Sequence, residues 1–150
     1  MPFIKPVHGP KIDLGSGAGF PGMVLAILGV PDITLVESNI RKCVFLRQAA
    51  RLTETPVDIF EGRLEDYRPP VPARAITARA LAPLDKLLDM VYPLLAADGV
   101  CLFLKGRNFK QELTDSRKRW HINAEILPSE SDSSGRIVII KELEPIHANP

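Results

Sequence analysis

Three closely spaced glycines follow the short apolar segment Lys11–Leu14, at positions Gly15, Gly17 and Gly19. Glycine adopts backbone conformations that other residues avoid, and it lets a ligand approach backbone N–H groups closely. The residues Phe20–Leu28 have helical character, and Pro21 is tolerated in the first turn of a helix. The pattern predicts a strand, a glycine loop and a helix, an arrangement that is typical of a ligand-binding turn.

Apolar strand-like segments alternate with helical segments along the rest of the chain. Besides the first strand, the strands are expected at Ile33–Glu37, Val57–Glu61, Ala75–Ala78, Val100–Leu104, Ile122–Leu127 and Arg136–Lys141. The helices are expected at Ile40–Leu52, capped by Ser38 or Asn39, at Leu84–Leu95 and at Asn108–Arg119. This order predicts an α/β fold with a mostly parallel sheet, helices on both faces and a terminal antiparallel hairpin. Such sheets bind ligands at the carboxyl ends of their strands.

The length and composition predict one domain over residues 1–150, with a core from about 4 to 141 and a tail at 142–150. No apolar run is long enough for a membrane span and Met1–Pro10 lacks the apolar region of a signal peptide, so we expect a cytoplasmic protein. We also expect a monomer. Cys43 and Cys101 lie in apolar stretches and are expected as reduced core thiols. The three histidines show no ligand spacing, and no metal is expected.

The glycine loop alone is compatible with two classes of ligand. Gly17, Gly19 and Gly22 also satisfy the dinucleotide fingerprint, and Glu37 lies at the distance expected for a carboxylate on a ribose hydroxyl in either class. Asp13, two residues before the first glycine, suits a ligand with ammonium and sulfonium charges better than a pyrophosphate. These features favour S-adenosylmethionine as the cofactor, and an NAD(P)-dependent oxidoreductase stays as an alternative.

Longer motifs carry a resemblance to one family. They are Ile12–Gly22 with its Gly-Phe-Pro-Gly ending, Leu35–Ser38, Arg41-Lys42, Phe45–Arg47 and Ala78-Arg-Ala80. Over about residues 4–141 the sequence resembles the bacterial 16S ribosomal RNA guanine-N7 methyltransferases, the family of glucose-inhibited division protein B. The resemblance implies a Rossmann-like class I methyltransferase fold with a seven-stranded sheet. It also implies methyl transfer to N7 of one guanine, and a helical segment ahead of the first strand that this sequence does not contain.

The resemblance also assigns site residues. It implies cofactor contacts from Gly15 and Phe20, a ribose carboxylate at Glu37, and an adenine-side segment at Leu64-Glu65. The predicted cofactor-binding residues are Asp13, Gly15, Gly17, Gly19, Phe20, Glu37, Leu64, Glu65 and Arg79. Guanine N7 is an unprotonated lone-pair nucleophile, so no general base is required. Arg79 and Lys105 are the predicted catalytic residues, although Arg79 could instead form a salt bridge with Asp85.

A local excess of basic residues follows the fifth expected strand. The predicted RNA-binding residues are Lys105, Arg107, Lys110, Arg117, Lys118 and Arg119. Glu112 and Asp115 could balance part of this charge as an ordinary solvated helix face. Phe109 could stack on a base or pack beneath the next helix, and Trp120 is expected in packing. The expected partner is 16S rRNA or the 30S particle, and a non-catalytic ribosome-binding module is a further alternative.

Overall fold

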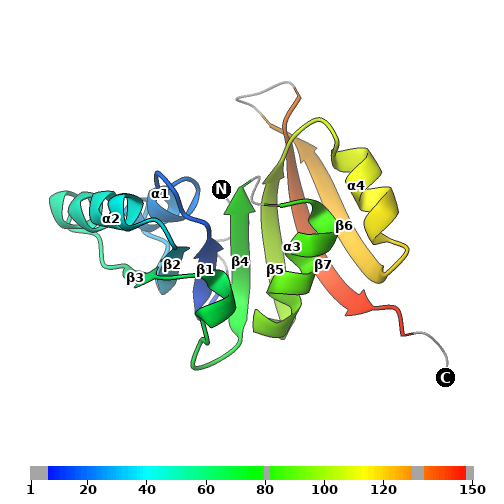
Figure 1. Ribbon diagram of the computed structural model, residues 1–150, viewed down its shortest axis with the longest axis horizontal. Coiled ribbons are helices and arrows are strands. Elements are labelled where there is room, and N and C mark those ends of the chain that lie inside the picture. The colour runs from blue at the N-terminus through cyan, green and yellow to red at the C-terminus, as the bar shows by residue number, and fades with distance from the viewer. Residues whose placement is uncertain (1–6, 80–81, 130–133, 148–150) are drawn as a thin grey trace.

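The computed structural model describes residues 7–79, 82–129 and 134–147, and its centre is a seven-stranded sheet (Figure 1). The strand order is β3-β2-β1-β4-β5-β7-β6. The bounds are β1 Lys11–Leu14, β2 Ile33–Glu37, β3 Asp58–Glu61, β4 Ala73–Arg79, β5 Leu95–Lys105, β6 Trp120–Pro128 and β7 Arg136–Pro145. Strands β1 to β5 are parallel, whereas β7 is antiparallel to both β5 and β6. The mostly parallel sheet with a terminal antiparallel hairpin is confirmed.

Helices cover both faces of this sheet, as the sequence pattern predicts (Figure 1). Their bounds are α1 Gly22–Ile27, α2 Ile40–Leu52, α3 Leu84–Val91 and α4 Phe109–Ser116, with 3-10 turns η1 Leu64–Asp66 and η2 Tyr92–Leu94. Helix α2 begins after Asn39, whose side-chain oxygen accepts a hydrogen bond from the Lys42 N–H at 3.0 Å. Asn39, rather than Ser38, is therefore the cap.

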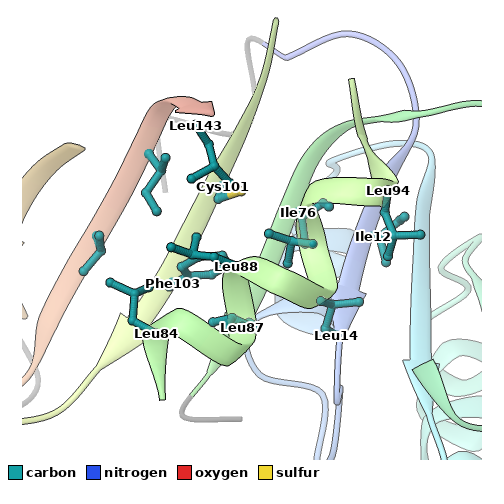
Figure 2. Packing of buried hydrophobic residues seen from close by; sticks show 14 of the residues in the cluster. Ile12, Leu14, Ile76, Leu84, Leu87, Leu88, Leu94, Cys101, Phe103 and Leu143 are labelled. Atoms are coloured by element: carbon teal, nitrogen blue, oxygen red, sulfur yellow. The ribbon is translucent and has the colours of Figure 1, made fainter. Parts of the chain in front are cut away.

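Each central strand supplies alternate residues to two separate cores. Ile76 of β4 and Phe103 of β5 pack in one core with α3 and α4, beside Leu84, Leu87 and Leu88 (Figure 2). Their neighbours Ala75 and Leu102 belong to the second core, with Met23 of α1 and Leu46 of α2. Because successive side chains of a strand point to opposite faces, residue parity assigns every strand-end side chain to one face of the sheet.

Two expected elements differ from the structure around β5. The helix predicted to reach Leu95 ends at Val91 and continues as the turn η2, because Pro93 has no N–H for an α-helical hydrogen bond. Strand β5 begins at Leu95, earlier than the predicted Val100. The pairing of β4 with β5 shifts register between Ala73 and Ala75, and the resulting bulge lies between Leu95 and Val100 of β5.

The terminal hairpin is longer than predicted, since the strand expected to end at Lys141 continues to Pro145 and pairs there with Trp120. Trp120 is 5% exposed and packs on Tyr92 with ring centroids 5.3 Å apart, which confirms its packing role. Cys43 and Cys101 are free and buried, as expected, and burial raises the pKa of Cys101 to about 12. In the described part of the chain, every helix is too short or too polar to cross a membrane.

Candidate functional site

The glycine loop joins the carboxyl end of β1 to α1 by a tight backbone path. Gly15, Gly17 and Gly19 have φ values of 61°, 54° and 97°, a region that favours glycine. The Ser16 N–H donates to the Val36 carbonyl oxygen at 3.1 Å, which ties the loop to β2. A Cβ atom at Gly19 would collide with Met23 of α1. The glycines therefore allow both the chain reversal and the close packing of α1 on the loop.

Glu37, the last residue of β2, holds this loop from the side. Its Oε1 accepts a hydrogen bond from the Gly17 N–H at 2.7 Å, and its Oε2 accepts one from the Asn39 N–H at 2.9 Å. The residue is 7% exposed. Its carbonyl oxygen also accepts a hydrogen bond from the Gly62 N–H at 3.0 Å. One residue thus connects the loops that follow β1, β2 and β3.

Asp13 lies beneath the glycine loop, away from its open side. The carboxyl group is fully buried, and its Oδ1 accepts a hydrogen bond from the Thr77 hydroxyl of β4 at 2.5 Å. Among the described residues, no group meets hydrogen-bond geometry with Oδ2. Burial raises the pKa of Asp13 to about 6, although the Thr77 and Ser16 hydroxyls and the Gly22 amide act in the opposite direction. In this structure the carboxyl group links β1 to β4, and its predicted contact with the cofactor stays a prediction.

Arg79, the last residue of β4, lies over the ring of Phe20, which ends the glycine loop. The guanidinium carbon is 5.8 Å from the ring centroid, a cation–π distance. Phe20 is 44% exposed, and Arg79 is exposed as well. In the described part of the chain Arg79 forms no ion pair, and Asp85 lies instead 3.9 Å from Arg119. The alternative pairing of Arg79 with Asp85 is therefore not found.

Leu64 and Glu65 form the start of η1, just beyond the end of β3. Leu64 is half-buried against the core, whereas Glu65 is exposed. The Gly62 N–H bond to the Glu37 carbonyl oxygen places this segment next to the acid at the end of β2. The structure thus brings the predicted adenine-side segment, Glu37 and the glycine loop to one edge of the sheet.

Lys105, at the end of β5, directs its ammonium group into the fold. Its Nζ lies 2.9 Å from Glu112 Oε1 and donates to the Ala82 carbonyl oxygen at 2.8 Å. The same Glu112 oxygen accepts a hydrogen bond from the Leu84 N–H at 2.9 Å. The side chain of Lys105 is only 6% exposed. Its charge therefore connects Ala82 and the beginning of α3 to α4, and little of it faces solvent.

The remaining predicted RNA-binding residues divide between two edges of the sheet. Arg107 and Lys110 are exposed beside the carboxyl end of β5, at the beginning of α4. Arg117–Arg119 follow the end of α4 and precede β6, at the amino end of β5 (Figure 1). There Arg119 pairs with Asp89 at 2.8 Å and Lys118 with Asp115 at 3.7 Å. Phe109, between Arg107 and Lys110 in the sequence, is 1% exposed and packs in the core.

Sequence reasoning missed two polar residues of this region. Thr77 is the hydroxyl partner of Asp13, although the two residues are 64 positions apart. Arg136 begins β7 and pairs in register with Lys105 at the end of β5. Both relations follow from strand register, which composition and local spacing do not reveal. The alternation of apolar residues in β4 and β7 was the available signal, since it assigns each side chain to a face.

Solved structures share this architecture. The glycopeptide N-methyltransferase MtfA in complex with S-adenosyl-L-homocysteine matches with a TM-score of 0.75 and 14% sequence identity, covering 94% of this chain and 86% of that chain. An rRNA methylase from Streptococcus thermophilus matches with a TM-score of 0.69 and 10% identity, covering 95% and 93% of the two chains. The strand order and the glycine loop define the class I fold of the S-adenosylmethionine-dependent methyltransferases.

The sequence comparisons identify the family. A family model described as rRNA small subunit methyltransferase G matches residues 1–135. A protein named Ribosomal RNA small subunit methyltransferase G from Paramagnetospirillum magneticum is 52% identical over 150 residues, which are 100% of this chain and 73% of that protein. Its namesake from Rhodospirillum centenum is 48% identical over 134 residues, 89% of this chain and 62% of that protein. The chain belongs to the rRNA small subunit methyltransferase G family and is a methyltransferase of the S-adenosylmethionine-dependent class.

The residues at the carboxyl edge fit an adenosine-containing cofactor. A Cβ atom at Gly17 would contact only the Gly15 carbonyl oxygen, at 3.7 Å, so the missing side chain leaves one face of the loop open to a ligand. Glu37 accepts one hydrogen bond at each carboxylate oxygen, and a carboxylate has further lone pairs for hydroxyl donors. The half-buried Leu64 offers an apolar surface beside that acid.

Proposed function

We propose that this protein transfers the methyl group of S-adenosylmethionine to N7 of a guanine in 16S ribosomal RNA. The observation that carries the proposal is the convergence of the Glu37-braced glycine loop and the exposed Arg79–Phe20 pair at one sheet edge, in a chain of this family. Relatives that share 48–52% of the aligned residues are named for methylation of small-subunit ribosomal RNA. The bound cofactor supplies an electrophilic methyl group on a sulfonium centre.

Different residues of the chain bind different parts of the cofactor. Glu37 accepts hydrogen bonds from the ribose hydroxyls, and the loop at Gly15–Gly19 presents its backbone to the ligand. Leu64 packs against the adenine while Glu65 borders it. Asp13 acts from beneath, because its bond to Thr77 fixes the loop relative to β4 rather than contacting the ligand.

Catalysis at N7 requires orientation more than proton transfer. Guanine N7 carries a lone pair and no proton, so the site needs no general base. Arg79 is exposed at the end of β4 and donates from a planar guanidinium, which suits the O6 edge of a guanine or a cofactor carboxylate. The ring of Phe20 restricts its orientation. Alignment of two reactants can lower a barrier by roughly 7–11 kcal/mol.

Lys105 contributes to this site as a positioning residue. Its ammonium group holds the Ala82 carbonyl oxygen and the Glu112 carboxylate, and Glu112 in turn holds the first N–H of α3. Ala82, three positions after Arg79 in the sequence, is thereby anchored to α4. Exposed basic side chains such as Arg107 and Lys110 contact the RNA instead. The reaction takes place in the cytoplasm, where ribosomal RNA is assembled.

The test is methyl transfer from cofactor labelled in its methyl group. The chain is incubated with deproteinised 16S rRNA and, separately, with 30S particles, and the RNA is then reduced with borohydride and cleaved with aniline at N7-methylguanine. We expect incorporation and cleavage at one guanine, and loss of both with Arg79→Gln. A matched control is Arg119→Gln, since Arg119 lies at the opposite edge and pairs with Asp89.

Three outcomes contradict the proposal in different ways. Incorporation without aniline cleavage points to a position other than N7. RNA binding without incorporation on either substrate supports a ribosome-binding module. Saturable binding of NAD(P) with no binding of S-adenosylmethionine supports the oxidoreductase alternative, which the antiparallel β7 and the family already disfavour.

A further inference from the structure

A cavity of about 310 Å³ opens where β5 ends and β7 begins, beside the catalytic region rather than within it. Its lining residues are Arg107, Phe109, Lys110, Ser134 and Arg136. This volume lies at the lower end of the range for small-ligand sites. Neither the proposed cofactor contacts nor the proposed catalytic residues line it, so the cavity is a separate feature of the same sheet edge.

The lining combines three positively charged side chains with one buried aromatic side chain. Arg107 and Lys110 are exposed, and neither forms an ion pair with the residues that the structure describes. Arg136 lines the cavity from the start of β7, and its Nη1 donates to the Gly135 carbonyl oxygen at 2.8 Å. Phe109, with 1% exposure, supplies an apolar wall at the start of α4. Three positively charged side chains therefore line one cavity.

The position of this cavity relative to Arg79 follows from strand register. Arg79 of β4 pairs with Leu104 of β5, and the next residue, Lys105, pairs with Arg136 of β7. Two strand spacings of roughly 4.8 Å each separate β4 from β7, or about 10 Å. By parity Arg79 lies on the α1 face and Arg136 on the α4 face. A nucleic acid strand bound across this edge can therefore reach Arg79 and Arg136 with nucleotides that are only a few positions apart.

We propose that Arg107, Lys110 and Arg136 form a pocket for one backbone phosphate of the RNA substrate, close to the nucleotide that is methylated. This assignment rests on the proposed function, since it takes RNA as the substrate. The bound chemistry is a phosphate group, and its source is the RNA backbone rather than free inorganic phosphate. Guanidinium groups bind phosphate through paired hydrogen bonds, whereas Lys110 contributes a point charge.

The experiment measures binding of a fluorescein-labelled single-stranded oligoribonucleotide by anisotropy, from about 50 to 200 mM salt. The pocket variant is Arg107→Gln/Lys110→Gln, whose two positions are exposed and so leave the core intact. The matched control is Arg117→Gln/Lys118→Gln, which removes the same charge from the exposed amino edge. Circular dichroism and binding of S-adenosylmethionine verify that both variants are folded. Methyl transfer is measured on the same samples.

We expect the pocket variant to bind more weakly and to lower the slope of log K against log salt by about 0.7, the value for one phosphate on a single strand. The control variant keeps the wild-type slope. Equal slopes for the two variants, or an unchanged slope in the pocket variant, overturn the proposal. So does calorimetric binding of inorganic phosphate that the pocket substitutions abolish while RNA affinity stays unchanged.

The two proposals fail separately. Loss of slope in the pocket variant supports the phosphate pocket even where methyl incorporation is absent, which contradicts only the proposed reaction. Normal methyl incorporation with an unchanged slope contradicts only the pocket. The variant Arg107→Lys/Lys110→Arg keeps a positive charge at both positions and is expected to show the wild-type slope.

Discussion

Lys110 lies in the first turn of α4 and Arg117 directly follows its last residue, yet the two lie at opposite edges of the sheet. At the carboxyl edge Lys110 and Arg107 are exposed without ion pairs among the described residues. At the amino edge Lys118 and Arg119 are paired with acids of α4 and α3. Helix α4 and the residues on either side of it connect the two edges, so basic residues that are close in sequence have different surroundings. Only the unpaired group borders the candidate site.

The largest expected effect is a difference in the rate of methyl transfer between a variant at the carboxyl edge and a variant at the amino edge. Arg79→Gln removes a positioned charge from the site, and we expect methyl transfer to fall by about 10²–10³-fold, as for loss of one preorganised donor. Arg119→Gln removes an equivalent charge at the amino edge and is expected to leave the rate unchanged. Single-turnover rates with saturating RNA test this contrast. Equal losses in the two variants contradict the division of the edges.

A second comparison concerns two ion pairs, of which one is buried at the carboxyl edge and the other is exposed at the amino edge. We expect them to contribute differently to the free energy of unfolding. Lys105→Met leaves the Glu112 carboxylate unpaired beside a buried segment, and we expect a loss of about 3 kcal/mol in the free energy of unfolding. Lys118→Met breaks the exposed pair with Asp115 and is expected to cost about 0.5 kcal/mol or less. Urea denaturation of both variants measures the difference. A small loss for Lys105→Met shows that its ammonium group does not anchor α3.

Asp13 provides a test of the buried side of the site. Its pKa is raised from 3.8 to about 6, so the folded protein binds more protons than the unfolded chain between these values. This contribution to stability is present below pH 4 and is lost as the pH rises to about 6, by at most roughly 3 kcal/mol. Asp13→Asn is expected to remove that slope from the pH dependence of the free energy of unfolding.

Thr77→Val sharpens the same test, because the Thr77 hydroxyl lowers the pKa of Asp13. Without that hydrogen bond the loss of stability is expected to extend to higher pH than in the wild type. Identical pH profiles for Thr77→Val and the wild type show that the contact is not made in solution.

The smallest expected effect compares the ends of two neighbouring strands. Glu37 and Glu61 are register partners at the ends of β2 and β3, but only Glu37 contacts the glycine loop. Glu37→Gln keeps an acceptor and loses the charge, so we expect about tenfold weaker binding of S-adenosylmethionine, or about 1.4 kcal/mol. Glu61→Gln is the control, and calorimetry is the measurement. Equal affinities of the two variants contradict the ribose role of Glu37.

The elements with strong local signals were predictable from the sequence. The apolar run at Ile33–Glu37 and the helix Ile40–Leu52 have the predicted bounds, because periodicity and the cap at Asn39 agree there. The beginning of β5 was not predictable from local composition. Leu95 pairs with Ala73 of β4 and Val100 pairs with Ala75, so residues 96–99 lie in the bulge between them, and this pairing overrides the helical periodicity that reaches Leu95.

The candidate site was predictable in position but not in contacts. Spacing places Glu37 and Arg79 at strand ends, where parallel sheets bind ligands. Asp13 and Lys105 occupy equivalent ends, yet packing with Gly22 and Glu112 turns their charges inward. The direction of each side chain depends on the helix that covers its strand. Motif spacing therefore cannot distinguish a residue that contacts the ligand from one that forms a buried structural contact.

The pairing of Lys105 with Arg136 determines how the chain can tolerate changes in length. A strand shifted by one residue presents every side chain to the opposite face, so one inserted residue between Arg136 and Ile140 would move Arg136 away from Arg107. An insertion of two residues would restore the face but shift the cavity along the sheet. The spacing within β7 is therefore a diagnostic trait, by which sequences able to form this pocket can be distinguished from those that share only the glycine loop.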